Sequence, residues 1–376
     1  MPAYHQMGHD SQNLLGEVTG YRGAILSPVN ESEADVKAIV QQCASDTFEF
    51  VFDPQLYFPR RFDRGRLAEW NYFPRDLETA DLSSASWWEP ILNELRATAE
   101  RVGAKAICSP AIVTSPFTND YYEAMRRHAD RLVELTGPSG QRVYQTVLIR
   151  LADLATVNRS MEIASIVSNT KAAGVYLVLL SDVKARDEFR EVEQIKGAMK
   201  LINVLERSQL PVLVGFSSSD VVLWKAAGAT ACATGKFGNL RRFSQGRFDE
   251  NEEGGRLMAY YFEEGLLAFL RTSDLLRVGP GGVSLTANNP FGTTIQTQLS
   301  NSPEKPWVAL GWRQYMHWFA DVEARLTSGA ANARHLVQKA EQNWQMLENN
   351  DVFMEERTND GGWLRPWLRA IVEFNK

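Results

Sequence analysis

The stretch PVLVGFSSSDVVLWKAAGATACATGKFGNLRRFSQGR, from Pro211 to Arg247, decides the fold that the sequence predicts. It predicts a buried strand over 211–216, a serine-rich turn, a short helix stopped by Gly228, and a second buried strand over 230–234. A basic loop follows. Strand, helix, strand and loop form the repeating unit of parallel α/β barrels, in which the loop after a strand carries the site. The alternative is an ordinary βαβ unit whose basic loop is simply solvated.

The same alternation extends over most of the chain. Aromatic, β-branched or apolar runs predict further strands at 24–28, 48–52, 104–113, 143–151 and 175–180, separated by segments with helical spacing. Strands that alternate with helices in this way predict a parallel sheet, and at this number a (β/α)8 barrel of the TIM type ahead of an open doubly wound sheet. No GxGxxG motif opens the first βα turn, which argues against dinucleotide binding.

We therefore divide the chain into three parts. Residues 1–23 are polar and form a loose N-terminal segment, residues 24–290 form the barrel, and residues 291–376, rich in tryptophan, form a helical extension. Within the barrel region, the apolar spacing over 255–276 predicts a helix. The predicted fold class is thus an α/β barrel with an inserted aromatic and basic loop and a helical C-terminal extension.

The composition is that of an ordinary globular protein, with 44% apolar and 23% charged residues. No apolar run is long enough to cross a membrane, and the N-terminus lacks the features of a secretory signal, so we expect a cytoplasmic location and no membrane partner. Three widely spaced cysteines (Cys43, Cys108, Cys232) and scattered histidines match no metal-ligand pattern. We therefore expect neither a metal centre nor a cofactor. The net charge of −6 argues mildly against non-specific nucleic-acid binding.

A long insertion, residues 55–85, follows the strand predicted at 48–52. It is too long for a routine connection and too aromatic for a disordered one, so we expect an ordered functional loop. Its alternating arginines and aromatic residues suit a groove for a nucleic-acid strand, with cations along the backbone and rings stacked on bases. A lid over the barrel and packing against a partner subunit are the alternatives. The residues concerned are Arg60, Arg61, Arg64 and Arg66, with Phe58, Phe62, Trp70, Tyr72 and Phe73.

Residues 211–247 resemble the seventh-strand region of the tRNA-guanine transglycosylase superfamily, whose (β/α)8 enzymes exchange nucleobases in tRNA and whose relatives act on DNA. The likeness rests on Gly215, the helix up to Gly228 and the letters ATACATGKFGNLRR, where the family has a strand aspartate followed by an arginine-containing loop. A second likeness is Phe52-Asp53-Pro54-Gln55, where the family has a strand that ends in Asp-Ser-Gly-Gly. The resemblance covers residues 24–250 and implies that Asp53 contacts the base and the reaction centre.

Departures from the family pattern change the reaction that the resemblance implies. The family's nucleophilic aspartate falls at or within one residue of Ala233, and its Cys-x-Cys-x-x-Cys zinc element is absent. One carboxylate, Asp53, remains. Base exchange needs a nucleophile that waits for an incoming base, whereas a single carboxylate suits activation of water or stabilisation of a sugar cation. The resemblance therefore implies hydrolysis of an N-glycosidic bond, with the base flipped into the barrel mouth.

The predicted catalytic residues are Asp53 and Lys236. Asp53 follows a buried strand, where barrels place catalytic groups, although aspartate before proline is also a common turn former. Lys236, in Gly-Lys-Phe-Gly, suits a phosphate contact better than service as an amine nucleophile. Predicted substrate contacts, with packing, helix capping or solvation as the alternatives, are Tyr57, Gln55, Ser217, Asp220 and Asn239. Predicted contacts to a nucleic-acid backbone are Arg60, Arg61, Arg64, Arg241, Arg242 and Arg247.

The resemblance, read with these residues, implies a DNA glycosylase that removes a modified base and leaves an abasic site, and the resemblance alone suggests defence against foreign DNA as one use. DNA is favoured over RNA as the partner. Three alternatives stay open: base exchange on tRNA or DNA, a small-molecule sugar-phosphate lyase or isomerase that uses Lys236, and a non-catalytic nucleic-acid-binding subunit. An Asp53→Asn variant that binds but does not react separates the glycosylase from the non-catalytic alternative.

Overall fold

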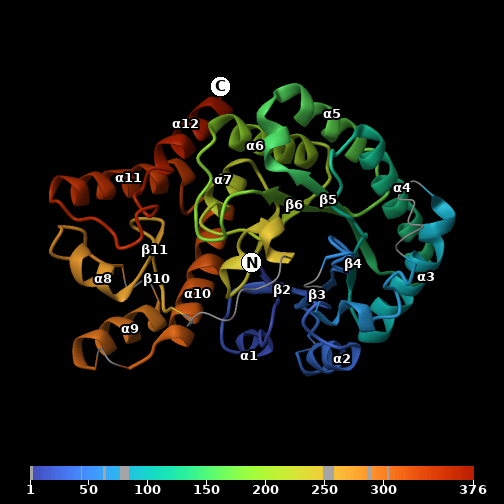
Figure 1. The fold of residues 1–376 in the computed structure, drawn as a ribbon, viewed down its shortest axis with the longest axis horizontal. Coiled ribbons are helices and arrows are strands. Elements are labelled where there is room, and N and C mark those ends of the chain that lie inside the picture. The colour runs from blue at the N-terminus through green and yellow to red at the C-terminus, as the bar shows by residue number, and fades with distance from the viewer. Residues whose placement is uncertain are drawn as a thin grey trace.

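The computed structural model describes residues 3–43, 45–61, 65–76, 84–248, 258–286, 289–302 and 305–376, without the side chains of Pro138 and Arg247. Eight parallel strands close into a barrel, because β1 pairs with both β2 and β8 and β5 pairs with both β4 and β6 (Figure 1). The predicted (β/α)8 fold is confirmed. The strands are β1 (Ala3–Gln6), β2 (Tyr21–Leu26), β3 (Glu49–Phe52), β4 (Ala106–Cys108), β5 (Arg142–Arg150), β6 (Gly174–Ser181), β7 (Val212–Val214) and β8 (Ala231–Thr234).

Helices surround the barrel, and the eighth outer helix is α10, which packs on α7, β1 and β8 (Figure 1). Short 3-10 turns lie between some of these elements. No helix in the described ranges combines the length and apolarity needed to cross a membrane. The outer helices are α1 (Gln12–Leu15), α2 (Glu33–Gln42), α3 (Ala85–Val102), α4 (Asn119–Thr136), α5 (Val157–Val167), α6 (Val192–Arg207), α7 (Val221–Ala226) and α10 (Val308–Thr327); the 3-10 turns are η1 (Gly65–Glu69), η2 (Gly137–Ser139) and η3 (Leu151–Ala155).

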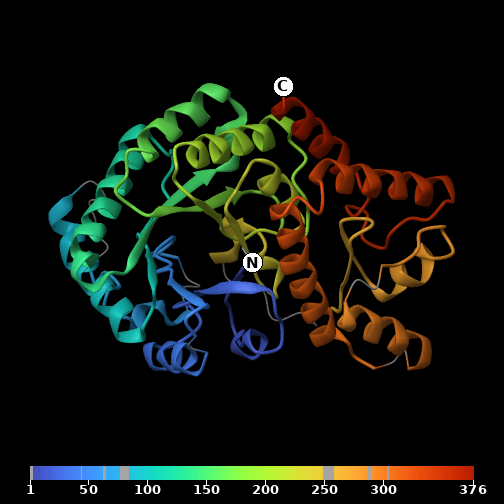
Figure 2. The same ribbon diagram turned by 180° about the vertical axis from the view of Figure 1, so that it is seen from behind.

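A lobe beside the barrel is built from the described residues between 258 and 302 together with α11 (Ala333–Asn349), and Figure 2 shows it in orange and red at one side. The final helix, α12, returns to pack on α6 and α7. Before the lobe, the chain crosses the barrel mouth as η4 (Gly238–Leu240), β9 (Phe243–Ser244) and η5 (Gln245–Phe248). The remaining elements are β10 (Tyr261–Glu263), β11 (Ala268–Leu270), α8 (Thr272–Val278), α9 (Pro290–Asn301), α11 (Ala333–Asn349) and α12 (Leu364–Phe374).

The structure corrects the predicted boundaries of the barrel. Its first strand is β1, inside the segment that we expected to be loose, and its last outer helix is α10, beyond residue 290. The sequence hides β1 because its inward positions are polar. The hydroxyl of Tyr4 donates a hydrogen bond of 2.5 Å to Glu49, and Gln6 accepts one of 3.0 Å from Tyr176. The side chains of Tyr4 and Gln6 thus each form a hydrogen bond across the barrel interior.

The helix predicted over 255–276 is wrong for 258–271 and correct for 272–276, which belong to α8. Residues 261–270 form the antiparallel hairpin β10–β11, followed by the short helix α8. Phe262 packs on Phe269 of the facing strand and on Trp318 of α10, with ring centroids 4.9 and 3.9 Å apart. The buried Glu263 accepts hydrogen bonds from the backbone N–H groups of Gly265 and Thr286, which fix the turn. Aromatic packing between strands thus decides the conformation.

Candidate active site

The carboxyl ends of the barrel strands meet at one mouth, where barrels of this type place their reacting groups. Asp53 lies there, directly after β3, and is 1% exposed. Its Oδ1 accepts a hydrogen bond of 3.0 Å from the backbone N–H of Gln55, and its Oδ2 accepts one of 2.9 Å from the hydroxyl of Tyr57. Two donors from the following loop therefore orient this carboxylate.

Tyr57 is buried and keeps its proton at neutral pH. Burial, and then the charge of Asp53, raises the pKa of Tyr57 well above the ordinary tyrosine value. The charges that Tyr176 and Cys108 can carry contribute to the same rise. The phenol is therefore a stable hydrogen-bond donor to the Asp53 carboxylate.

Two further side chains meet inside the barrel. The hydroxyl of Tyr176, on β6, donates a hydrogen bond of 3.0 Å to Oε1 of Gln6, on β1. Because β1 and β6 are not neighbours in the sheet, this bond crosses the barrel interior. A Cβ at position 215, directly after β7, would lie 2.6 Å from the Tyr176 ring. This position therefore needs a glycine.

We call Gln6, Asp53, Tyr57, Cys108 and Tyr176 the central cluster. They come from β1, the loop after β3, β4 and β6, and each is at most 2% exposed. Burial, and then the charges of Asp53 and Glu49, raises the pKa of the Cys108 thiol well above the ordinary value. Cys108 is therefore a neutral thiol and not a thiolate nucleophile. Asp53 carries the one carboxylate among these five residues.

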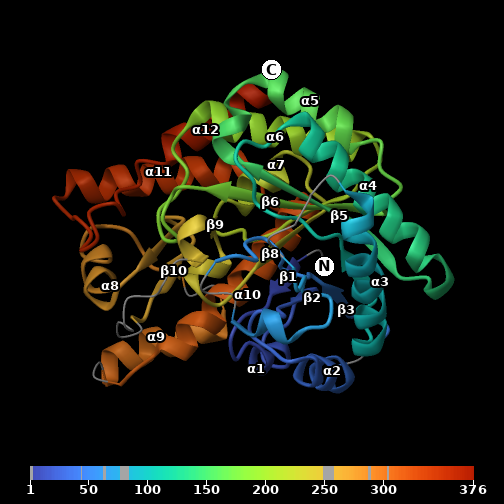
Figure 3. The same cartoon turned by 45° about the vertical axis from the view of Figure 1, so that its right-hand side comes forward.

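An aromatic cover lies over the central cluster. Phe243 of β9 packs on Tyr57 and on Phe216, with ring centroids 4.9 Å apart in both pairs. Phe248 packs on Phe58 at 4.6 Å and on Phe243 at 5.8 Å. The strand β9 is held at the end of β6 by the pairs of Leu180 with Phe243 and Ser181 with Ser244, and Figure 3 shows the two strands side by side. The loops after β3 and β8 thus meet over Tyr57.

Backbone strain also gathers at this mouth. Three non-glycine residues in loops after barrel strands have left-handed backbones: Asp10 after β1, Gln55 after β3 and Phe216 after β7, with φ of 52°, 54° and 54°. Such residues cost of order 1–3 kcal/mol each and concentrate at functional sites. Their location supports the mouth as the working end of the barrel.

The predicted substrate contacts Tyr57 and Gln55 have different roles in the structure. Tyr57 joins Asp53 in the central cluster. The side chain of Gln55 instead anchors its own loop, because its Oε1 accepts hydrogen bonds from Ser27 Oγ (3.2 Å) and from the backbone N–H of Val29 (3.0 Å). Gln55 contributes its backbone N–H to the site, and its side-chain amide anchors the loop.

Lys236 contacts the loop after β1 and the start of α10, whereas Asp53 accepts hydrogen bonds from the loop after β3. Its ammonium donates a hydrogen bond of 2.7 Å to the carbonyl of Asp10 and sits over the rings of Phe237 and Trp312, at 4.7 and 5.0 Å. Lys236 is 5% exposed, and burial lowers its pKa. These contacts hold the β1–α1 loop against the start of α10. The predicted catalytic partnership of Lys236 with Asp53 receives no support from them.

The predicted phosphate contact of Arg242 and substrate contacts of Ser217 and Asp220 are not supported either. Arg242 is 2% exposed and donates to Asp220 Oδ2 and to Glu188 Oε2, each at 2.8 Å. The Ser217 hydroxyl donates to the other oxygen of Asp220 at 2.7 Å. Burial raises the pKa of Glu188, and the charge of Arg242 opposes that rise. These residues form a buried ion network that fixes the loop after β7 and the loop after β6, and Asp220 does not cap α7.

Arg241 is likewise an interior residue, contrary to its predicted role. It donates hydrogen bonds of 2.8 and 2.7 Å to the carbonyls of Gly235 and Lys236, and its guanidinium lies 3.7 Å from the centre of the Tyr315 ring. Burial lowers its pKa to about 10. Asn239 is exposed in η4, and the side chain of Arg247 lies outside the described part of the chain.

Most aromatic residues of the loop after β3 pack inside the protein. Trp70 donates to the carbonyl of Pro28 at 3.0 Å and Tyr72 to that of Pro54 at 3.1 Å, and both side chains, like Phe73, are buried. They are not available to stack on bases. Arg66 pairs with Glu69 and Asp35, Arg60 is exposed, and Arg61 lies 5.9 Å from the Phe58 ring; Phe62 and Arg64 fall outside the described residues.

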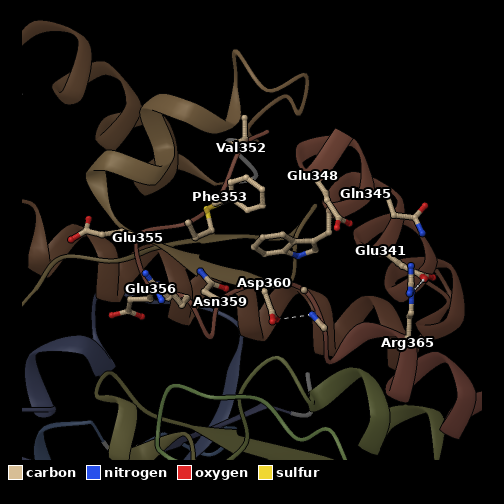
Figure 4. Close-up of a pocket in the computed structure, with 15 residues that line it drawn as sticks. Glu341, Gln345, Glu348, Val352, Phe353, Glu355, Glu356, Asn359, Asp360 and Arg365 are labelled. Carbon is tan, nitrogen blue, oxygen red and sulfur yellow. Dashed lines mark hydrogen bonds and ion pairs between the residues drawn. The ribbon is translucent and has the colours of Figure 1, made fainter. Parts of the chain in front are cut away.

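A cavity of about 660 Å³ lies in the lobe, between α11, α12 and the loop that joins them (Figure 4). Arginines neutralise several carboxylates around it: Glu341 pairs with Arg365 at 3.0 Å, and Asp360 pairs with Arg190 at 2.8 Å. Glu355 is bound in the same way by an arginine of the lobe. No barrel strand end lines this cavity, so we do not place the active site there.

Sequence reasoning missed three residues that shape the mouth: Gln6, Tyr176 and Phe243. A usable signal existed for Tyr176, since a tyrosine inside the apolar run VYLVLL requires a partner for its hydroxyl. No local pattern marks Gln6 or Phe243. Within the described residues, no group of three or more histidine, cysteine, aspartate or glutamate side chains is arranged to hold a metal ion.

Comparisons with known proteins give likenesses in fold alone. No protein-family profile matches the chain, and no curated protein matches it. Among solved structures, a monomeric dihydrodipicolinate synthase variant is similar at 12% identity and a TM-score of 0.37, over 63% of this chain and 70% of that one. A triosephosphate isomerase from Bartonella henselae is similar at 9% identity and a TM-score of 0.34, over 62% and 91%. An L-ribulose 3-epimerase is similar at 11% identity and a TM-score of 0.37, over 87% and 98%.

Proposed function

We propose that the chain is an enzyme that moves protons on a small, uncharged polar molecule, such as an unphosphorylated sugar, at the barrel mouth. The observation that carries this proposal is the buried Asp53 carboxylate with the Tyr57 hydroxyl 2.9 Å from its Oδ2. An oriented carboxylate at the end of a barrel strand suits a general base. The reaction class is that of an isomerase or lyase.

The charges around the mouth favour a neutral substrate. Lys236, Arg241 and Arg242, the cations expected to hold phosphates, are engaged by backbone carbonyls or by buried carboxylates. The central cluster offers amide and hydroxyl groups instead, from Gln6, Tyr57 and Tyr176. Such groups match the hydroxyl and carbonyl groups of a sugar.

Asp53 has a definite role in this chemistry. It accepts a proton from the carbon beside a carbonyl group, and the electron pair left on that carbon forms an enediolate. In an isomerisation, Asp53 then returns the proton to the neighbouring carbon, while the hydroxyl proton passes from the oxygen that becomes the carbonyl to the oxygen that becomes the hydroxyl. In an elimination, the electron pair instead expels a leaving group from the next carbon, and that group takes the proton that Asp53 holds. Tyr57, which stays protonated, holds the carboxylate in the orientation that this transfer needs.

The second candidate function is cleavage of the N-glycosidic bond to a nucleobase in DNA, as the transglycosylase resemblance implies. The observation that favours it is the single loop after β3, which carries Asp53, the exposed Arg60, and Arg61 stacked near Phe58. In this reaction Asp53 activates water or stabilises the sugar cation, while the arginines contact the strand.

One experiment separates the two candidates. Wild-type protein and Asp53→Asn are incubated in deuterium oxide with a panel of unphosphorylated aldoses and ketoses, and deuterium in carbon–hydrogen positions is measured by mass spectrometry. Parallel samples contain DNA with normal or modified bases and are probed for alkali-labile abasic sites. Deuterium incorporation by wild type alone supports the proposal, and abasic sites with wild type alone support the second candidate. If wild type does neither, both are rejected.

A further inference from the structure

Gln6 is a buried side chain with an unused hydrogen-bond donor. It is 0% exposed, and its Oε1 accepts the hydroxyl of Tyr176 at 3.0 Å. Its Nε2 has no hydrogen-bond partner within the described part of the chain. Buried polar atoms are nearly always paired, and an unpaired donor costs about 1–3 kcal/mol. An unsatisfied amide in the core of a barrel therefore needs an explanation.

The amide of Gln6 faces the barrel interior. Tyr4, two residues earlier on the same strand, reaches Glu49 of β3, and Gln6 reaches Tyr176 of β6; neither strand neighbours β1. Both bonds therefore cross the interior, as the alternation of a strand requires for positions two apart. On β3, Glu49 faces the same interior, and the alternation of the strand directs Asp53, four residues later, to that side as well. Gln6 and Asp53 therefore both project toward the inside of the barrel.

We propose that Gln6 is a substrate-positioning residue whose Nε2–H donates a hydrogen bond to an uncharged acceptor oxygen of the substrate. This inference rests on the proposed function and narrows its substrate class. The ligand presents an acceptor to Gln6 and a donor to the nearby Asp53, a pair that a vicinal diol or an α-hydroxy carbonyl compound supplies. An anionic acceptor is disfavoured, because it would lie near the Asp53 carboxylate.

Gln145 provides a matched control. It is 1% exposed and also has one unpartnered amide atom, Oε1. Its neighbour Tyr144 packs near Gly174, which is two residues before the inward Tyr176, so Tyr144 faces the interior. The adjacent Gln145 then faces the helices outside the barrel. Gln6 and Gln145 are both buried glutamines. They differ in direction, because Gln6 projects into the barrel and Gln145 projects toward the helices outside it.

The experiment compares Gln6→Met with Gln145→Met, since methionine keeps the length and volume of glutamine. Thermal unfolding is measured with and without D-ribose, D-fructose and 1,2-propanediol at high millimolar concentration, and deuterium exchange into the two sugars is followed. For a sugar that stabilises wild type or exchanges with it, we expect Gln6→Met to weaken binding about tenfold, the effect of one hydrogen bond. Gln145→Met is expected to bind like wild type. Wild-type affinity in Gln6→Met overturns the inference.

Stability without ligand gives a second readout, which needs no substrate. The double variant Gln6→Met/Tyr176→Phe removes both partners of the internal hydrogen bond together with the unpaired donor. We expect its melting temperature to equal or exceed that of wild type, since the unpaired donor and the hydrogen bond beside it are removed together. A lower melting temperature shows that the amide serves the fold, for example through a buried water, and overturns the inference. Failure of the proposed function appears separately, as a wild-type protein that exchanges no deuterium.

Discussion

The hydroxyl of Tyr57 donates a hydrogen bond of 2.9 Å to Oδ2 of Asp53, and both residues belong to the chain that leaves β3. The left-handed backbone of Gln55 between them turns this chain back toward the barrel centre. The side chain of Gln55 is tied to Ser27 and Val29, so the turn is fixed from the neighbouring loop. The local backbone geometry of this turn therefore contributes to the orientation of the carboxylate.

Replacing Tyr57 by phenylalanine is expected to lower turnover by about 100-fold, because the Asp53 carboxylate loses one of the donors that orient it. The melting temperature should change little, since the ring stays in place against Phe243. The measurement is kcat/KM for the reaction that the deuterium screen identifies. Tyr72→Phe is the control, because it removes a buried hydroxyl that bonds to the Pro54 carbonyl. Equal turnover in Tyr57→Phe and wild type would exclude this role.

Replacing Arg242 by alanine is expected to destabilise the fold by about 3–5 kcal/mol, because it leaves the buried Asp220 and Glu188 without their cation. Urea unfolding monitored by circular dichroism measures the loss. Arg60→Ala, at an exposed position, should change the free energy of unfolding by less than about 0.5 kcal/mol. If Arg242 contacted a ligand instead, its removal would weaken binding and leave stability unchanged.

Stability should fall in acid because of His5. Burial, and then the charge of Lys236, lowers the pKa of His5 from 6.5 to about 3. Between these two pKa values the unfolded chain binds a proton at His5 that the folded protein does not. The contribution of His5 to the free energy of unfolding therefore falls as pH decreases, by about 1.4 kcal/mol per pH unit. Urea unfolding at pH 6, 5 and 4 tests this. His5→Gln should flatten the slope, whereas the exposed His335→Gln should not. An unchanged slope in His5→Gln would show that other groups cause the acid dependence.

The buried Glu323 should make the protein less stable as pH increases. It is 0% exposed, accepts the backbone N–H of Cys232 at 2.7 Å and lies 3.9 Å from Lys225. Burial raises its pKa from 4.5 to about 8, partly offset by Lys225. Between these values the folded protein holds a proton that the unfolded chain releases, so stability falls as pH increases. Glu323→Gln stays neutral and should be more stable than wild type at pH 8. A less stable variant at that pH would mean that the ionised pair with Lys225 is favourable.

The sequence predicted the barrel because seven of its strands are marked by apolar or aromatic runs next to helical spacing. It could not predict β1, whose inward Tyr4 and Gln6 find their partners across the barrel, on strands distant in sequence. The hairpin β10–β11 was missed for a related reason. Its aromatic residues pack on Trp318, a contact that apolar spacing alone does not reveal.

The candidate site was predicted in part. A carboxylate directly after a buried strand pointed to Asp53, and the nearby Tyr57 proved to be its hydrogen-bond partner. The contacts predicted for Arg241 and Arg242 were misjudged, because a basic stretch has the same letters whether its cations face solvent or are buried. Asp220 and Glu188, which neutralise Arg242, lie far from it in sequence. Such pairings become visible only once the fold is known.

The most direct test of the account is solvent deuterium exchange catalysed by wild type and by Asp53→Asn, measured with the sugar panel at neutral pH. Asparagine keeps the shape of the side chain and removes its basicity, so circular dichroism and the melting temperature should match those of wild type closely. The account predicts that exchange falls by about 100-fold or more in the variant. An Asp53→Asn protein that is folded and exchanges deuterium at the wild-type rate would contradict the central claim that Asp53 is the base.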